Sequence, residues 1–416
     1  MSSENKSCTP KLRFPGFTGE WASKPLSFFL HEHRTKSDGK CEVHSVSVSK
    51  GVINQVEYLG RSFAAADTSK YNLAKPNDII YTKSPTGAFP YGIVKQNKNP
   101  YNVIVSPLYA VYTPINKFVG YILDSFFESA ANTNSYLESL IQKGAKNTIN
   151  ISNDTFVSKA VCLPLDPAEQ EKIATFLSEI DALISAQDQK VERLKEHKKG
   201  LMQQLFPQPG ETKPRLRFPE FSGEWEEKTL GEVFKRITTR NAEDNQNVLT
   251  ISAQYGLISQ LDFFKKSVSA SDVTGYYLLE KGDFAYNKSS SQGKPVGAIK
   301  PLKLYEKGVV STLYICFRCD IPDSIGYWEQ YFDAGIFDCE IMSIAQEGAR
   351  NHGLLNVPTG DFFKLKVKMP NLSEQQKIAN CLAHFDNIIS SESTKLEALQ
   401  AHKKGLMQQL FPTPSK

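Results

Sequence analysis

Residues 169–207 read EQEKIATFLSEIDALISAQDQKVERLKEHKKGLMQQLFP, and residues 374–412 read EQQKIANCLAHFDNIISSESTKLEALQAHKKGLMQQLFP. The two stretches, which we call the long repeats, are identical at 23 of 39 positions and lie 205 residues apart. A match of this length indicates an internal duplication of the chain.

A second pair of matching segments lies near the start of each copy. KLRFPGFTGEW at 11–21 returns as RLRFPEFSGEW at 215–225, with 8 of 11 positions identical and an offset of 204. We call these the short repeats. Because the two offsets differ by one residue, the stretches between the repeats, 22–168 and 226–373, have nearly equal lengths although their sequences have diverged. The period is far longer than the ~20–50 residues of a solenoid, so each copy is predicted to be a whole domain with a long appendage.

The long repeats have apolar residues at a seven-residue step, which is typical of a coiled-coil seam. Asp166-Pro167 supplies an N-cap and a first helical position, and Pro207 follows the end of the first repeat. We predict one long helix per copy, and a two-fold relation between the copies would pair the helices in an antiparallel coiled coil. Gln187 and Glu392 are polar seam residues near the expected crossing point, where they would fix the register. In the alternative, each helix lies on its own domain. The seam residues expected to pair are Ile173, Leu177, Ile180, Ile184, Gln187, Val191 and Leu194 with Ile378, Leu382, Phe385, Ile389, Glu392, Leu396 and Leu399.

The diverged stretches between the repeats, which we call the bodies, have the pattern of α+β domains. Short runs rich in Val, Ile, Tyr and Phe alternate with Gly, Pro and Asn turns. This pattern predicts strands at 78–81, 101–105, 109–112, 248–251, 309–317 and 365–369, and helices at 118–129 and 326–337. The fold class is therefore α+β, with two α/β bodies related by a pseudo-two-fold axis and separated by the two long helices.

The total charge says little about partners, because 49 basic and 45 acidic residues leave +4 on 416 residues. Locally, however, residues 61–98 and 281–307 each carry a net +4 with Tyr, Ser, Asn and Gln between the cations. This mixture suits phosphates and base edges, although a solvated surface has a similar composition. The loop residues Lys146, Asn147, Arg350 and Asn351 fit either base reading or an ordinary turn with a phosphate-binding cation. The candidate DNA contacts are Lys83, Ser84, Thr86, Lys146, Asn147, Lys288, Ser289, Ser290, Gln292, Lys294, Arg350 and Asn351.

No catalytic motif is found in the sequence. Gly293-Lys294 is followed by Pro295, which breaks a phosphate-binding loop, and no glycine-rich cofactor turn follows a strand. Cys316 and Cys319 form a lone C-x-x-C that the other copy does not repeat, so a strand face is favoured over zinc. His31-Glu32-His33 has metal-ligand spacing, but it aligns with Arg236-Ile237-Thr238, which offers no set of metal ligands. Histidines that face solvent or DNA are therefore the safer interpretation. We therefore expect no catalytic residue, no cofactor and no metal.

The expected compartment is the cytoplasm. Seven cysteines at irregular spacing fit reduced thiols better than a disulfide framework. No run of roughly 18 apolar residues and no basic segment followed by an apolar one is present, so neither a membrane helix nor a secretion signal is expected.

A chain with two diverged bodies, two nearly identical long helices and no active site resembles the specificity subunit of type I restriction-modification systems. The resemblance covers essentially the whole length, and its motifs are L-R-F-P-x-F-x-G-E-W and E-Q-x-K-I-A…H-K-K-G-L-M-Q-Q-L-F-P, each present twice. It implies two target recognition domains, each reading half of a bipartite DNA site, and paired helices that set the distance between them. It also implies that the chain docks two modification subunits, which methylate adenine, and through them the restriction subunits.

The repeats and this resemblance predict five segments. The first copy has an N-terminal segment with the first recognition domain at 1–165, followed by the first spacer helix at 166–207. The second copy has a linker with the short repeat at 208–224, the second recognition domain at 225–370 and the second spacer helix at 371–412. Two alternatives are a self-contained DNA-modifying enzyme with a cryptic cofactor site and a coiled-coil scaffold that does not bind DNA.

Overall fold

The computed structural model describes residues 8–143, 149–252, 256–264, 272–290, 294–347, 353 and 355–412. The chain divides into two compact units. Unit 1 contains residues 1–188 and 394–416, and unit 2 contains residues 189–393. Each unit therefore combines one body with a part of both long repeats.

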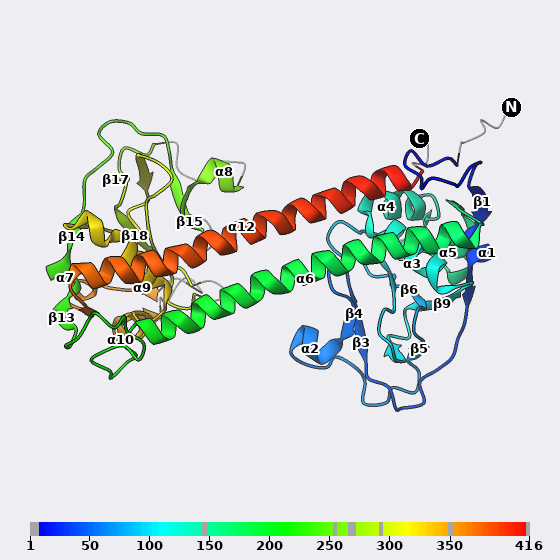
Figure 1. The fold of residues 1–416 in the computed structure, drawn as a ribbon, viewed down its shortest axis with the longest axis horizontal. Coiled ribbons are helices and arrows are strands. Elements are labelled where there is room, and N and C mark those ends of the chain that lie inside the picture. Colours follow the sequence, from blue (N-terminus) through cyan, green and yellow to red (C-terminus); the bar gives the residue numbers. More distant parts are fainter. Residues whose placement is uncertain are drawn as a thin grey trace. The chain divides into compact units, whose positions relative to one another are not determined.

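The long repeats form two helices of 39 residues each, α6 (Pro167–Leu205) and α12 (Leu372–Leu410) (Figure 1). The predicted helices are thus confirmed, with ends within two residues of the expected ones. Asp166 caps α6 by accepting a hydrogen bond from the backbone N–H of Ala168 at 2.9 Å, and Asn371 caps α12 by accepting one from Glu374 at 3.0 Å.

In unit 1 the body consists of short strands and helices. Its strands are β1 (Ala22–Pro25), β2 (Leu30–Glu32), β3 (His44–Ser47), β4 (Gly51–Asn54), β5 (Asn72–Ala74), β6 (Ile79–Tyr81), β7 (Val94–Gln96), β8 (Val103–Val105), β9 (Ala110–Pro114), β10 (Gln142–Lys143), β11 (Ile149–Asn150) and β12 (Ala160–Leu163). Its helices are α1 (Leu26–Phe29), α2 (Gln55–Leu59), α3 (Lys117–Glu128), α4 (Ala130–Glu138) and α5 (Asn153–Ser158).

The body of unit 2 repeats this order of strands. They are β13 (Glu226–Thr229), β14 (Phe234–Ile237), β15 (Leu249–Ser252), β16 (Gly256–Ser259), β17 (Tyr277–Glu280), β18 (Phe284–Asn287), β19 (Ala298–Pro301), β20 (Lys307–Val310), β21 (Ile315–Cys319), β22 (Gln346–Glu347), β23 (Leu355–Asn356) and β24 (Lys366–Met369). Its helices are α7 (Leu230–Val233), α8 (Gln260–Phe264), the 3₁₀ helix η1 (Pro322–Ser324), α9 (Ile325–Asp333), α10 (Asp338–Ile344) and α11 (Thr359–Phe362).

Both bodies have the same sheet topology. A four-stranded antiparallel sheet has the order β2-β9-β6-β7 in unit 1 and β14-β21-β18-β19 in unit 2. The two-stranded pairs correspond in the same way, for example β1-β12 with β13-β24 and β5-β8 with β17-β20. The prediction that one α+β fold occurs twice is confirmed, although the body sequences have diverged.

Two sequence-based boundaries were wrong. The run 309–317 is not one strand, because β20 ends at Val310 and a turn closed by Tyr314 N–H donating to Ser311 O at 3.0 Å precedes β21. Unit 1 has the same turn, in which Tyr109 donates to Ser106 at 3.0 Å. The helix predicted at 326–337 ends as α9 at Asp333, because the chain turns at Gly335, whose φ is 75°.

Each core is completed by the end of the other copy's helix. The unit 1 core contains Ile173 and Leu177 from the start of α6, together with Met407, Leu410 and Phe411 from the end of α12. The unit 2 core contains the equivalent residues with the helices exchanged: Ile378, Leu382, Met202, Leu205 and Phe206. The neighbouring backbone repeats the exchange, since Leu12 N–H donates to Gln409 O at 3.0 Å in unit 1 and Leu216 N–H to Gln204 O at 2.9 Å in unit 2.

The helices run antiparallel within each unit. In unit 2, Lys190 pairs with Glu392 at 2.8 Å and Lys198 pairs with Asp386 at 2.6 Å, so higher numbers on α6 meet lower numbers on α12. In unit 1, Lys403 of α12 pairs with Asp181 of α6 at 2.6 Å. The alternative in which each helix lies only on its own domain was therefore wrong.

The seam residues differ in burial along the helices. Those near the cores or at the polar position are buried: Ile173, Leu177, Gln187, Val191, Ile378 and Leu382. The others are half-buried: Ile180, Ile184, Leu194, Phe385, Ile389, Glu392, Leu396 and Leu399. A helix that has one helical neighbour and no body against it leaves part of its seam accessible to solvent.

The cysteine prediction needs a correction. Cys8 and Cys162, which lie 154 residues apart in the sequence, form a disulfide with their Cα atoms 5.6 Å apart. The expectation that all thiols are reduced was wrong for this pair, because sequence spacing does not reveal that the N-terminal segment lies beside β12. The other five cysteines are free.

Candidate nucleic-acid interface

The first candidate loops join a central strand of each large sheet to its edge strand: 82–93 connects β6 to β7, and 288–297 connects β18 to β19. The Tyr81 hydroxyl donates to Tyr91 O at 2.9 Å, and the equivalent Tyr286 hydroxyl donates to Val296 O at 2.6 Å. Both tyrosines are buried, and burial raises the pKa of each hydroxyl well above its ordinary value, so both stay protonated donors. The base of each loop is therefore held in the same way.

A glycine at the end of each loop allows the chain to approach the preceding strand closely. Gly92 and Gly297 have φ values of 97° and 87°. A Cβ atom would lie 1.9 Å from Thr82 O in the first loop and 2.0 Å from Asn287 O in the second, so only glycine fits without a backbone shift.

A buried aspartate directly precedes the strand that leads into each loop, and its side-chain partner differs between the copies. Asp78 accepts hydrogen bonds from His33 Nε2 and Thr113 Oγ1, both at 2.8 Å. The equivalent Asp283 accepts from Arg318 Nη2 at 2.8 Å. The interpretation of His33 as facing solvent or DNA was therefore wrong, because it is the partner of a buried carboxylate.

Strand pairing also corrects the alignment of this region. Glu32 lies opposite Tyr112, and Arg236 lies opposite the equivalent Phe317. The structural equivalent of Glu32 is thus Arg236, one residue from the sequence-based alignment. Cys316 and Cys319 do lie on a strand, β21, as predicted, and contribute to separate core clusters.

Lys83 and Lys288 are equivalent cations at the start of the two loops. Neither forms an ion pair with a carboxylate of the described residues. Burial lowers the pKa of both, and Glu32 partly offsets this effect for Lys83. Lys83 is exposed and Lys288 is half-buried, so an equivalent cation at the same place in the two diverged bodies is accessible to a ligand.

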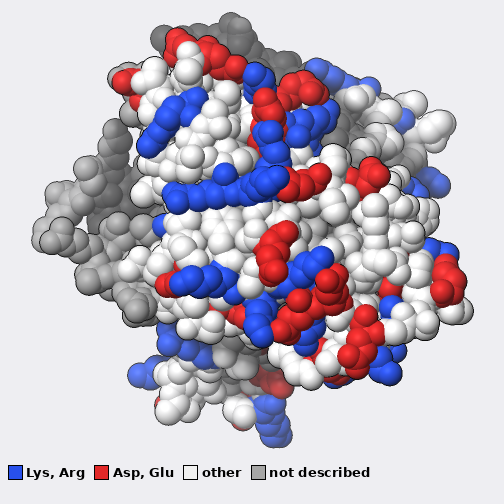
Figure 2. Space-filling view, turned by 90° about the vertical axis from the view of Figure 1, so that its left-hand side faces the viewer, with Lys and Arg blue, Asp and Glu red and all other residues white. Residues whose placement is uncertain are grey.

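Five cations of the two basic stretches form ion pairs shorter than 3 Å, four of them in 281–307 and one in 61–98. The ion pairs are Lys98–Asp124 at 2.8 Å, Lys281–Glu306 at 2.7 Å, Lys300–Asp333 at 2.7 Å, Lys303–Glu329 at 2.6 Å and Lys307–Glu243 at 2.7 Å. The face drawn in Figure 2 likewise shows basic and acidic side chains next to one another. The net +4 of 281–307 therefore overstates the positive charge available to a nucleic acid, because Lys300, Lys303 and Lys307 meet carboxylates from elsewhere in the chain.

The remaining candidates of these loops have different environments. Ser84, Thr86, Ser289 and Ser290 are exposed, as a contact to a ligand requires. Lys294 is half-buried, with its Nζ 3.9 Å from Asp333 Oδ1. Lys146, Asn147, Gln292, Arg350 and Asn351 lie outside the described residues.

Backbone contacts bring two candidate segments of unit 2 together. Ser290 N–H donates to Gly353 O at 2.6 Å, and Leu355 N–H donates to Lys288 O at 3.1 Å. The loop after β18 thus lies beside Gly353 and Leu355, while the candidates Arg350 and Asn351 lie outside the described residues. Sequence reasoning treated these two segments separately.

The short repeats bind the start of the long repeats. Arg13 forms two hydrogen bonds with Glu169, at 2.7 and 2.8 Å, and Arg217 forms the same two with Glu374, at 2.8 and 2.7 Å. Both glutamates are buried, with 2% and 1% of their side-chain surface exposed. The residues shared by the two copies are thus explained by contact with each other, and they were missed at the sequence level.

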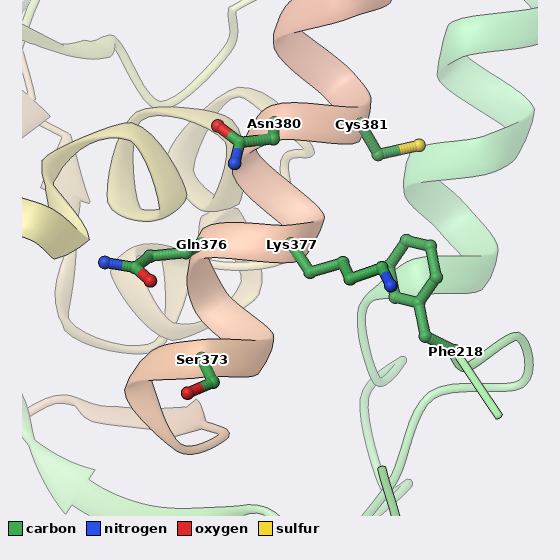
Figure 3. A pocket seen from close by; sticks show the side chains of 6 residues that line it. All are labelled: Phe218, Ser373, Gln376, Lys377, Asn380 and Cys381. Carbon is green, nitrogen blue, oxygen red and sulfur yellow. The ribbon is translucent and has the colours of Figure 1, made fainter. Parts of the chain in front are cut away.

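A shallow pocket of about 430 Å³ lies where these repeats meet in unit 2 (Figure 3). It is lined by Phe218, Ser373, Gln376, Lys377, Asn380 and Cys381, none of which is a candidate DNA contact. In unit 1 the equivalent of Cys381 is Phe176, whose ring packs edge-on against Phe14 with centroids 5.3 Å apart. The pocket therefore reflects the smaller side chain at 381.

Neither a metal site nor a membrane span stands out. Among the described residues, no three His, Cys, Asp or Glu side chains come together to hold a metal ion. The helices of that part of the chain include none long and apolar enough to cross a membrane.

Comparison with known proteins identifies the family. The model of the type I restriction modification DNA specificity domain matches residues 37–196 and 333–401, together more than half of the chain. The chain belongs to this family. The resemblance seen in the repeated motifs is thereby confirmed.

Individual relatives agree with this family. The type I restriction enzyme MjaVIII specificity subunit of Methanocaldococcus jannaschii is 35% identical over 69 residues, which are 17% of this chain and 16% of the relative. The crystal structure of the type I restriction-modification S subunit from M. genitalium has a TM-score of 0.57 and 14% identity, covering 98% of this chain and 100% of that one. The HsdS subunit from Thermoanaerobacter tengcongensis gives a TM-score of 0.39 and 13% identity over 96% of this chain and 97% of that one. The M. genitalium likeness supports the shared fold.

Proposed function

We propose that this chain is the DNA-specificity subunit of a type I restriction-modification complex, in which each body reads one half of a bipartite site on double-stranded DNA. The subunit has no catalytic role and binds no cofactor of its own. It acts in the cytoplasm, together with two methyltransferase subunits docked on the long helices and, through the complex, with restriction subunits.

The observation that carries this proposal is the pair Lys83 and Lys288. Two bodies of one topology present an equivalent lysine, with no carboxylate partner among the described residues, at the start of equivalently anchored loops. A duplicated reader suits a bipartite site, because each copy presents the same elements to its own half-site. Divergence of the bodies suits two half-sites of different sequence.

The proposed DNA contacts are the loop residues predicted from the sequence. In unit 2, Lys288, Ser289 and Ser290 lie beside the 353–355 backbone, so this loop and Arg350 with Asn351 would contact one stretch of DNA. Arginine and asparagine suit guanine and adenine, respectively, in the major groove. The proposed domain boundaries remain 1–165, 166–207, 208–224, 225–370 and 371–412.

Body exchange tests this function directly. The chain is co-expressed with its modification subunits, and methylated adenines are mapped in the host DNA. Replacing residues 225–370 with the corresponding body of another specificity subunit should change one half of the methylated site and leave the other half unchanged. An unchanged site would contradict the proposal, and methylation by the purified chain alone would favour the self-contained enzyme.

A single substitution tests the loop. If the Lys288 side chain reads a base, Lys288→Ala should weaken binding to the target site by roughly 1–3 kcal/mol. If it contacts a phosphate, the variant should lose affinity about equally for target and random DNA. Lys281→Ala is the matched control, because Lys281 is exposed and paired with Glu306. Equal binding by both variants and the parent chain would exclude Lys288 from the interface.

A further inference from the structure

A charged residue occupies the apolar seam at one equivalent place in each long helix. Lys198 in α6 and Lys403 in α12 hold the d position of the heptad, and their side chains are only 13% and 8% exposed. Each bonds an aspartate of the other helix at 2.6 Å, Lys198 with Asp386 and Lys403 with Asp181. The two pairs occupy equivalent positions of the repeat, and each unit contains one of them. We call them the seam pins.

Stability alone does not explain the seam pins. The lysine of each pin is largely removed from water, although Asp386 and Asp181 keep 46% and 27% of their side chains exposed. Removing a charge from water is costly, and an apolar pair of similar volume is commonly as stable as a buried ion pair or more so. A leucine at 198 and 403 would continue the apolar seam on either side. An ion pair adds a directional contact, because charge-assisted hydrogen bonds form only within a narrow range of geometry. Apolar contact is not directional, so two apolar surfaces can shift against each other at little cost.

In unit 1 the pin also binds the body. Lys403 Nζ lies 2.6 Å from Glu128 Oε2 of α3, and the hydroxyl of Tyr121, also on α3, donates to Asp181 at 2.5 Å. Lys98, which pairs with Asp124 of α3, lies 3.7 Å from Asp181. Burial lowers the pKa of Lys403, but Glu128 and Asp181 outweigh this effect and raise it, so the ammonium stays charged.

In unit 2 the pin has the same architecture with fewer partners. Gln330 of α9, the helix equivalent to α3, donates from Nε2 to Asp386 Oδ2 at 2.8 Å while Lys198 binds Oδ1. Each pin thus joins three elements of one unit: α6, α12 and the first long helix of the body. The orientation of the body on the helix pair is fixed at this junction.

We propose that the seam pins are positioning residues that determine which spacer length between the two half-sites the protein accepts. This inference rests on the proposed function. One added base pair advances the second half-site by about 3.4 Å and turns it by about 35° around the duplex. A body held in one orientation rejects the displaced half-site, whereas a body that pivots on an apolar seam follows it.

The test removes the unit 2 pin without leaving a buried charge. The complex with its modification subunits is assembled with the variant Lys198→Leu/Asp386→Leu, and methylation is measured on DNA whose spacer is one base pair shorter than, equal to or one longer than the parent's site. The matched control is Lys190→Ala/Glu392→Ala, an ion pair between the same helices whose lysine side chain is 53% exposed, against 13% for Lys198.

The parent and the control are expected to discriminate against the altered spacers. In the pin variant this discrimination should fall about tenfold, or ~1.4 kcal/mol, while the half-site bases and the melting temperature are retained. The exchanged pair Lys198→Asp/Asp386→Lys should restore discrimination, because the Gln330 amide can accept as well as donate. A folded pin variant that discriminates as well as the parent overturns the inference.

The outcomes separate the two proposals. If the parent complex methylates no bipartite site, the proposed function fails. If it methylates one and the pin variant shows unchanged spacer discrimination, the function stands and the role of the pins is refuted. If the control loses discrimination equally, the effect comes from the helix pair in general, which also refutes a specific role for the pins.

Discussion

Removing Arg217 should destabilise unit 2 strongly, because it leaves a fully buried carboxylate without its partner. Both side-chain oxygens of Glu374 are bound by Arg217, at 2.8 and 2.7 Å, and the glutamate side chain is 1% exposed. The Nε1 atom of the neighbouring Trp225 has no partner within the described structure. Breaking a buried ion pair on one side costs about 3–5 kcal/mol.

Unit 1 contains an internal comparison. Arg13 binds Glu169 with the same geometry, but here Trp21 Nε1 also donates to Glu169 at 3.1 Å. A hydrogen bond to a charged group contributes about 1.5–3 kcal/mol, so the tryptophan retains part of the stabilisation when the arginine is removed. We therefore expect Arg13→Ala to cost about 1.5–3 kcal/mol less than Arg217→Ala.

Thermal unfolding of the purified chain measures both effects. For a unit of this size, each kcal/mol corresponds to about 2–4 °C, so Arg217→Ala should lower the melting temperature of unit 2 by about 6–20 °C. The control is Arg215→Ala, since Arg215 is exposed and solvent screens its pair with Glu211, so its loss should change stability little. Adding Glu374→Gln to Arg217→Ala should recover part of the loss. Equal losses for Arg217→Ala and Arg215→Ala would refute the buried-charge argument, and equal losses for both buried arginines would refute the role of the tryptophan.

Three further predictions concern the loop, the pin and the chain ends. Gly297→Ala should displace the second loop and reduce methylation at one half-site only, whereas Gly275→Ala, with open space around it, should not. Burial raises the pKa of Asp181, but its hydrogen bonds outweigh burial and lower the pKa below 3.8. The contribution of Asp181 to stability is therefore lost as pH falls below about 4. Asp181→Asn should flatten that part of the plot of melting temperature against pH. A permuted chain that joins the present ends and opens within 208–214 should fold and methylate the parental site; loss of folding by circular dichroism would contradict the exchanged cores.

The sequence was sufficient for the features that repeat. The long helices could be placed within two residues because a heptad pattern, an N-cap and a terminal proline agree on their bounds. The α+β character of the bodies also followed from the strand pattern. Boundaries within the bodies were less accurate, as at 309–317, where a four-residue turn between two apolar strands leaves no break in hydrophobicity.

The net charge of the candidate site could not be predicted from the sequence, because ion pairs join residues that are far apart in the chain. A count along the chain includes every lysine of 281–307, but Lys300 meets Asp333 and Lys307 meets Glu243, 33 and 64 residues away. Only the fold shows which cations are already neutralised. The same holds for Lys198 and Lys403: the sequence reveals two charged residues at core positions, and the structure supplies the aspartates that make those positions tolerable.

The structural unit and the sequence copy are different objects in this chain, and this difference explains which residues the copies share. A sequence copy runs from a short repeat to the end of a long repeat, but each unit is completed by the end of the other copy's helix. Leu12 meets Gln409 across the chain ends, just as Leu216 meets Gln204 across the linker. Each residue in such a contact lies in one unit, but its partner comes from the other sequence copy, so changing one copy alone disturbs contacts with the other copy. The described residues of the loops after β6 and β18 make no such exchanged contact, so the proposed function leaves each body free to diverge toward its own half-site.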